Sequence, residues 1–185
     1  MDLDKVIVKR CSVRKFHKKR PNYRDIIEAV DAGIKAPLAG NIPCVKFILI
    51  DDPEIIAKLA EASQQDFVAD VHYVVAVCSD KKDVIRSYYE RGERYVKQQA
   101  GAAIENFLLK LTELGLATCW VGAFIDEQIK KALKIPANVD IEAFFQIGYS
   151  LLNDKQKKKP ALDNSLFYNQ FGNRTMKPRI QVEAH

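Results

Sequence analysis

The sequence predicts an α+β fold, built as a single domain with an extended C-terminal arm. The chain has 185 residues, of which 48% are hydrophobic and 29% charged, which is enough for one sizeable core but not for two. Strand and helix patterns interleave along residues 1–150, whereas regularly spaced apolar residues end after Ser150. We therefore expect a core of residues 1–150 and an arm of residues 151–185 that lies against a second copy of the chain.

The first half of the core predicts two helices and two strands. The segment PNYRDIIEAVDAGIKAP predicts a helix that begins after Pro21 and Asn22 and stops at Pro37. Its apolar residues share one helical face: Ile26, Ile27, Val30 and Ile34. The loop APLAGNIPC then leads into the strand VKFILI. DPEIIAKLAEA predicts a second helix with Pro53 in its first turn, and HYVVAVC predicts a second strand in the same sheet.

The second half of the core predicts further helices and two more strands. The sequence turns helical from about Lys82, and YVKQQAGAAIENFLLKLTELG is the longest helical pattern, with Gly115 as its C-cap. The small residues 100–103 would let another element pack closely. LATCWV and IEAFFQIGYS predict two strands, separated by a helix that starts near Asp126 and ends before Pro136.

Composition narrows the classes of partner. Lys and Arg number 29 against 24 Asp and Glu, a net charge of +5 with a pI near 8.9, which suits an acidic small molecule better than a nucleic-acid groove. Four separated cysteines predict small buried thiols in a reducing compartment. The opening MDLDKVIVKR lacks the charge pattern of a signal peptide, and no apolar run could cross a bilayer. We expect a soluble cytoplasmic protein with neither a nucleic-acid nor a membrane partner.

The segment VKRCSVRKF places donors for anions at every second position. If its backbone is extended, Arg10, Ser12 and Arg14 point to one side, roughly 7 Å apart. Two guanidinium groups and a hydroxyl in a row can hold a phosphate. The alternative is a short edge strand that its charges keep soluble.

Motifs for protein nucleophiles and metals are absent from the sequence. It contains no HExxH, GxSxG, Walker or GxGxxG motif. The three histidines are isolated from one another: His17, His72 and His185. The acidic residues 51–54 stand at a helix entrance, where capping explains them better than acid–base chemistry. We therefore predict no catalytic side chain and no metal ligand, and expect a cofactor to supply any reactivity.

Five segments, in order, resemble the FMN-dependent nitroreductase family. They are RCSVRKF, APLAGNIPCVKF, GLATCWVGAF followed by QIGYS, and KKKPALDNSLFYNQFG, and they cover about residues 6–172. The resemblance implies a central, mostly antiparallel sheet flanked by helices. It also implies a homodimer whose arms wrap the partner, with two FMN sites at the subunit interface. NADH or NADPH would reduce the flavin through N5 in a ping-pong cycle, and an acceptor such as a nitroaromatic or a quinone would then be reduced.

The resemblance also implies which residues bind the cofactor. Arg10, Ser12 and Arg14 would clamp the flavin phosphate and ribityl chain, and Lys158 would close the clamp. The ring would be held by residues from three loops: Pro37, Leu38 and Asn41 from the other subunit, Gln65 or the adjacent Gln64 at the polar edge, and Val121 and Gly122 through a backbone N–H toward N5.

Some residues depart from the family pattern or admit two interpretations. Leu38 stands where the family commonly has Ser, and Ile42-Pro43-Cys44 where it has Gln-Pro-Trp, so a polar contact to flavin or substrate is expected to be missing. Trp120 is expected to be an ordinary core residue. Tyr88 or Tyr89 would cap the substrate side of the ring, or would only pack between helices.

Two alternatives to the oxidoreductase remain open. One is another reaction on the same scaffold, either reductive dehalogenation or flavin fragmentation. The other is a module that binds flavin without turnover. The sequence names neither the physiological substrate nor the preferred nicotinamide.

Overall fold

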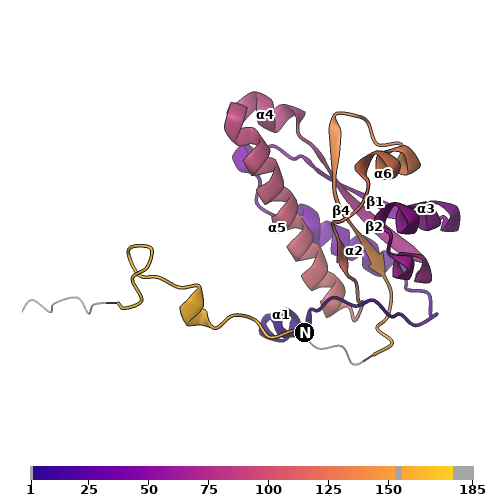
Figure 1. Cartoon of the computed structure of the whole chain (residues 1–185), viewed down its shortest axis with the longest axis horizontal. Helices are drawn as coiled ribbons and strands as arrows, with labels where there is room; N and C mark the ends of the chain where they lie inside the picture. Colours follow the sequence, from indigo (N-terminus) through magenta and orange to yellow (C-terminus); the bar gives the residue numbers. More distant parts are fainter. Residues whose placement is uncertain (1, 153–155, 177–185) are drawn as a thin grey trace, which may run out of the picture.

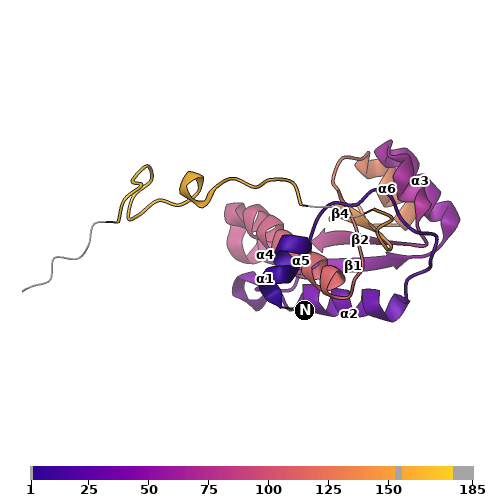
Figure 2. The same ribbon diagram turned by 90° about the horizontal axis from the view of Figure 1, so that it is seen from below.

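A four-stranded antiparallel sheet separates two layers of helices in the computed structural model, which describes residues 2–152 and 156–176 (Figures 1 and 2). Across the sheet the strands are β1 (Val45–Ile50), β2 (Tyr73–Asp80), β4 (Val139–Ile147) and β3 (Trp120–Val121). The helices are α1 (Leu3–Lys9), α2 (Tyr23–Ile34), α3 (Pro53–Ser63), α4 (Lys82–Tyr88), α5 (Gly92–Glu113) and α6 (Asp126–Leu133). Short 3-10 turns lie at Ala39–Asn41, Asp66–Asp70, Tyr89–Arg91 and Leu162–Asn164. The predicted α+β class and antiparallel sheet are confirmed.

The two central strands, β2 and β4, are buried on both faces because helices cover each side. One face packs against α3 and α6, and the other packs against α2 and α5. Figure 2 shows α3 and α6 above the sheet and α2 below it. Side chains alternate between the faces along each strand, so Phe144 enters the first core and Phe145 the second. The sequence of a strand that is buried on both faces is mostly a continuous run of apolar residues.

The apolar face expected for α2 needs correction. The face of α2 that packs against the core consists of Ile26, Ala29 and Gly33, whereas Ile27 and Ile34 are about half exposed. The helix turns this way because Gly33 lies close to α5: a methyl group there would come 3.1 Å from the Ala103 carbonyl oxygen. Two other elements also differ from the sequence prediction. The helix α1 was not predicted, and the predicted strand LATCWV forms only a two-residue strand, β3.

The segment after α1 is fixed to the rest of the core by backbone hydrogen bonds. Val13 N–H donates to the Thr118 carbonyl at 2.9 Å, and His17 N–H donates to the Tyr149 carbonyl at 2.9 Å. The side chain of Val13 is buried. This pairing places the predicted anion-binding segment beside the turns that flank β3 and β4.

The C-terminal arm begins against α1 and then leads away from the sheet (Figures 1 and 2). The Gln156 side-chain amide donates to the carbonyls of Ile7 and Arg10, at 3.3 and 3.1 Å. Farther along the arm, Phe171 is 93% exposed. The parts of the predicted arm at residues 153–155 and 177–185 lie outside the described residues. Among the described helices, none is long and apolar enough to cross a membrane.

A network of charges joins β4 to α4, α5 and α6. The register of β2 and β4 shifts at Glu142, which has no partner residue in the ladder and accepts hydrogen bonds from Lys97 at 2.9 and 3.1 Å. Asp140, two residues earlier, lies 3.1 Å from Lys81, 3.6 Å from Lys97 and 3.8 Å from Lys130. The bulge thus directs a carboxylate toward α5.

Replacing Asp140 with Asn should lower the free energy of unfolding by about 1–2 kcal/mol at neutral pH, because three lysines lose their shared carboxylate. Burial raises the pKa of Asp140, but the hydrogen bond from Lys81 and the charges of Lys97 and Lys130 outweigh burial, so the pKa lies below its ordinary value of 3.8. The stabilisation is therefore present above that ordinary value and is lost as the pH falls through the folded-state pKa.

Urea denaturation at neutral pH and near pH 3 measures this difference, which should shrink at the lower pH. Asp51→Asn is the control, because its ion pair with Arg20 is exposed and should contribute less than about 0.5 kcal/mol. Equal stability of Asp140→Asn and the unchanged protein at neutral pH would refute the stabilising role of the network.

Candidate functional site

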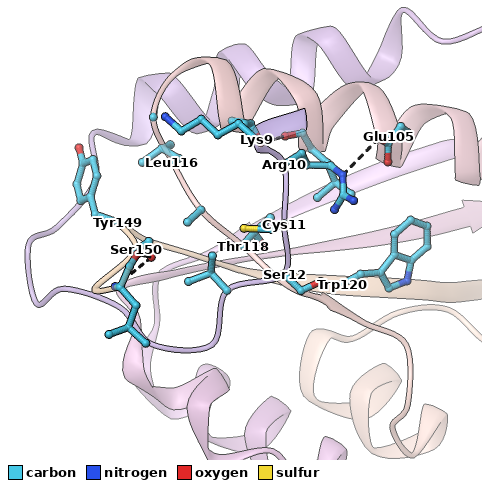
Figure 3. Close-up of a pocket in the computed structure, with 16 residues that line it drawn as sticks. Lys9, Arg10, Cys11, Ser12, Glu105, Leu116, Thr118, Trp120, Tyr149 and Ser150 are labelled. Carbon is cyan, nitrogen blue, oxygen red and sulfur yellow. Dashed lines mark hydrogen bonds and ion pairs between the residues drawn. The ribbon is translucent and has the colours of Figure 1, made fainter. Parts of the chain in front are cut away.

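A cavity of about 460 Å³ lies between the segment after α1, the C-terminal half of α5 and the turn before β3 (Figure 3). Its wall includes Arg10, Ser12, Thr118 and Trp120. Arg10 is the C-cap residue of α1, so the end of this helix places its guanidinium at the cavity. Figure 3 shows Arg10, Ser12 and Trp120 on the same side of it.

From Ser12 to Arg14 the anion-binding segment has the alternation that an extended chain predicts, whereas Arg10 ends α1 and is partly buried like its neighbour Cys11. Val13 is buried, whereas Ser12 and Arg14 are exposed. Arg10 is partly buried, and its Nε lies 3.6 Å from the Glu105 carboxylate on α5. The ion pair holds the guanidinium over the cavity while leaving its other N–H groups available to a ligand.

Thr118 adds an unpaired polar atom to the cavity wall. The residue is only 7% exposed, and among the described residues its hydroxyl oxygen has no hydrogen-bond partner. A buried hydroxyl without a partner costs free energy. A ligand or water in the cavity would supply the missing bond.

Three other predicted residues lie outside the wall of this cavity and gather around the turn that carries Phe67 and the end of β3. The Arg14 guanidinium lies over the Phe67 ring, 5.8 Å from its centroid. Gln65, in the same turn as Phe67, directs its amide toward the Ala123 carbonyl at 3.5 Å. Gly122, the neighbour of Ala123, is exposed at the end of β3. Fold contacts therefore bring together residues that are about 50 positions apart in the sequence.

The residues of β3 divide into core and surface. Val121 is fully buried, so only its backbone can contact a ligand. Phe124 packs on Phe144 at a centroid distance of 5.4 Å, as a core residue would. Trp120, in contrast, is 45% exposed, and the expectation that it is an ordinary core residue is wrong. Trp120 lies on the edge strand β3, and its side chain borders the cavity.

Pro37, Leu38 and Asn41 lie elsewhere on the chain. They belong to the loop between α2 and β1, which lies against the N-terminal half of α5. Two cavities of about 460 and 430 Å³ meet this loop, and Leu38 and Gln99 contribute to both. Gln99 is only 4% exposed, and neither polar atom of its side chain has a partner among the described residues. In a single chain this loop does not join the first cavity.

The two tyrosines before α5 differ in role. Tyr88 packs edge-on against Tyr95 at 5.0 Å, which agrees with the helix-packing interpretation. Tyr89 is 78% exposed, with a backbone φ of +48°. Neither belongs to the wall of the Arg10 cavity.

Lys158 lies in the arm and is exposed. It follows Gln156 by two residues, and Gln156 bonds to the Arg10 carbonyl. The start of the arm therefore runs next to the segment that carries Arg10.

Sequence reasoning missed Glu105 and Thr118. Glu105 lies on the helix that was predicted, but nothing in its spacing distinguishes it from other exposed charges of α5. Thr118 lies in the predicted strand LATCWV, and only the backbone bond from Val13 reveals that it meets the N-terminal segment.

The residues that the structure describes offer no cluster for a metal ion, and burial keeps two of the thiols unreactive. They contain no group of three or more His, Cys, Asp or Glu side chains that could hold a metal. Burial, helped by the charge of Glu142, raises the pKa of Cys78 to about 11, and burial raises the pKa of Cys44 as well. These two thiols stay protonated at neutral pH, so neither is a nucleophile.

Comparison with known proteins agrees with this architecture. The family model described as Nitroreductase family matches residues 7–69 and 62–149. A protein of Archaeoglobus fulgidus, named for NADH dehydrogenase or NAD(P)H nitroreductase activity, is 31% identical over 150 residues, which cover 78% of this chain and 83% of that one. The iodotyrosine deiodinase of Thermotoga neapolitana is 23% identical over 179 residues, 88% of this chain and 95% of that one.

A solved structure gives the same fold. NADPH:FMN oxidoreductase from Vibrio harveyi, in complex with NAD+, has a TM-score of 0.82 to this chain and 19% sequence identity, with 91% of this chain and 77% of that one covered. At this identity the likeness shows the fold.

The loop that carries Pro37, Leu38 and Asn41 should depend on Gly40. This glycine has a φ of +56°, and a methyl group on it would overlap the Tyr88 hydroxyl. Gly40→Ala should therefore lower the free energy of unfolding by about 2–4 kcal/mol, measured by chemical denaturation. Adding Tyr88→Phe should recover part of the loss, because it removes the overlapped hydroxyl.

Gly115→Ala is the matched control for backbone strain. Gly115 has a φ of +78° and no neighbour within 4 Å of an added methyl group, so its substitution should cost only about 1–2 kcal/mol. If the two alanine variants lose the same stability, contact with Tyr88 does not restrict Gly40.

Proposed function

The chain belongs to the nitroreductase family, and we propose that it is an FMN-dependent oxidoreductase that takes electrons from NADH or NADPH and reduces an organic acceptor such as a nitroaromatic or a quinone. The observation that carries the proposal is the cavity that combines the Arg10 guanidinium, the Ser12 hydroxyl and the unpaired Thr118 hydroxyl beside the exposed indole of Trp120. Hydrogen-bond donors next to an aromatic surface suit a flat ring with a phosphate tail.

The donors of the cavity fit the phosphate and ribityl chain of FMN. Arg10 and Arg14 would bind phosphate oxygens through paired N–H groups, and Ser12 would donate from its hydroxyl. Thr118 would gain the partner that it lacks among the described residues. Lys158 would add a charge from the arm, because Gln156, two residues before it, donates a hydrogen bond to the Arg10 carbonyl.

The residues beside the cavity fit the ring of the flavin. Gly122 is exposed, so a ring can approach its backbone closely, and a backbone N–H of Val121 or Gly122 would donate to N5. Gln65 already points its amide at the neighbouring Ala123 carbonyl, and it would present that amide to the polar edge of the ring.

The loop of Pro37, Leu38 and Asn41 would serve the flavin of a second subunit in a homodimer. Its distance from the Arg10 cavity within one chain supports that arrangement, and so does the unpaired, buried amide of Gln99 beside it. The exposed apolar residues of the arm, Phe171 among them, support an arm that covers a partner rather than its own core. Leu38 has no polar group in its side chain, so a substrate contact with this side chain would be apolar.

Catalysis would consist mainly of positioning. FMN, when bound, would supply the redox chemistry between NADH or NADPH and the acceptor. The chain would fix the phosphate with permanently charged guanidinium groups, keep the ring against β3 and donate a backbone hydrogen bond. No protein nucleophile is required.

A second reaction has a specific observation in its favour. The similarity to the iodotyrosine deiodinase of Thermotoga neapolitana extends over 88% of this chain. Reductive dehalogenation is therefore the alternative use of the same flavin site. A module that binds flavin without turnover is the non-enzymatic alternative.

A visible absorption spectrum tests the proposal. The purified chain, mixed with FMN without oxygen, should give a bound-flavin spectrum that bleaches on addition of NADH or NADPH and returns when a nitroaromatic or quinone is added. Colour that returns only with a halogenated phenol would favour dehalogenation, and bound flavin that never bleaches would favour the module. Light scattering of the same sample should give the mass of two chains.

The phosphate clamp predicts the effect of single substitutions on cofactor affinity. Arg10→Ala and Arg14→Ala should each weaken FMN binding by about 1.5–3 kcal/mol, roughly 10- to 150-fold in Kd, because each removes a charge-assisted hydrogen bond. Titration of the apoprotein with FMN measures this. Arg24→Ala is the control, because Arg24 is exposed on α2 and is not part of the cavity wall.

Riboflavin, which lacks the phosphate, separates the contributions that the phosphate and the ring of FMN make to its affinity. Arg14→Ala and the unchanged protein should bind riboflavin equally. Unchanged FMN affinity in either arginine variant would remove that arginine from the site.

A further inference from the structure

Trp120 is a large aromatic residue held in the open between two buried neighbours. Cys119 and Val121 are almost fully buried, whereas the indole is 45% exposed. Phe145 supports it from one side with its ring edge-on, at a centroid distance of 5.6 Å. A tryptophan half exposed in water is costly, and here its open surface belongs to the wall of the Arg10 cavity.

The polar groups nearby define what could cover the indole. Arg10 and Ser12 lie on the same side of the cavity as Trp120 (Figure 3). Thr118, two residues before Trp120, contributes a buried hydroxyl without a partner among the described residues. An anion at Arg10 that carries a planar ring would satisfy the hydroxyl and cover the indole together.

The indole and the backbone of Gly122 form one continuous surface. A methyl group added to Gly122 would lie 3.4 Å from the indole nitrogen of Trp120 and 3.7 Å from its Cδ1, with no other residue within 4 Å. The absence of a side chain at Gly122 therefore leaves the indole open toward the end of β3, where a flat molecule can lie across both.

We propose that Trp120 is the positioning residue for the ring of the bound flavin, with its indole in direct contact with the isoalloxazine. The inference rests on the proposed function and goes beyond it. The proposed function gives the ring a backbone contact at the end of β3, and the inference adds a contact with an aromatic side chain. The contact adds dispersion and stacking energy that is independent of the phosphate clamp.

Flavin fluorescence tests the contact, because Trp120 is the sole tryptophan of the chain. Indole quenches an excited flavin by electron transfer only at contact distance, and excitation in the visible band of the flavin does not excite tryptophan. Bound FMN should therefore be dark in the unchanged protein and clearly emissive in Trp120→Leu. The same substitution should weaken the binding of FMN and of riboflavin by about tenfold, measured by dialysis.

Two further variants provide controls. Tyr149→Phe alters another aromatic residue of the same cavity wall and should leave the bound flavin dark. Trp120→Phe should restore most of the binding without restoring the quenching, because phenylalanine stacks but is hard to oxidise. This pattern distinguishes contact with the ring from a general loss of folding.

The outcomes separate this inference from the proposed function. FMN that binds to Trp120→Leu with unchanged affinity and stays dark would overturn the role of Trp120 and leave the flavoprotein proposal intact. Emission restored by Tyr149→Phe alone would assign the contact to Tyr149 instead. Failure of the unchanged protein to retain FMN in dialysis would overturn both.

Discussion

The attachment of the segment after α1 to the sheet is the constraint on which the rest of the site depends. Backbone bonds from Val13 to Thr118 and from His17 to Tyr149 fix it at both ends, and the buried Phe16 anchors it between them. Phe16 needs the space beside Gly148, where a methyl group would come 2.7 Å from its ring. Without this attachment, Arg10 and Ser12 would not face β3, and the cavity would lose one wall.

The division of the predicted residues between two places follows from the topology. The sheet order β1-β2-β4-β3 puts the loop before β1 at one edge and the end of β3 at the other. Residues from the two edges of one sheet cannot meet around one ligand unless a second chain contributes. A homodimer would resolve this, and it would also give the unpaired amide of Gln99 and the exposed arm their partners.

The sequence predicted the helices and strands well because their patterns are local. Asn22 and Asp52 cap α2 and α3 as expected, and the alternation around Val13 was visible in the sequence. The orientation of α2 was not, because the close approach of Gly33 to α5 is a tertiary contact. Trp120 was misjudged for a related reason: a tryptophan in an apolar run is usually core, and only the tertiary structure shows that it lies on an edge strand beside a cavity.

The pairing of Arg10 with Glu105 explains how the site can be ready before a ligand arrives. At 3.6 Å and with Glu105 half exposed, the pair contributes little stability, yet it limits the rotamers of the guanidinium. An incoming phosphate would then meet a donor that has already lost part of its conformational entropy, which would favour binding. Because the remaining N–H groups of Arg10 are free to donate, the phosphate need not displace Glu105, and the carboxylate can keep the guanidinium in place while the ligand is bound.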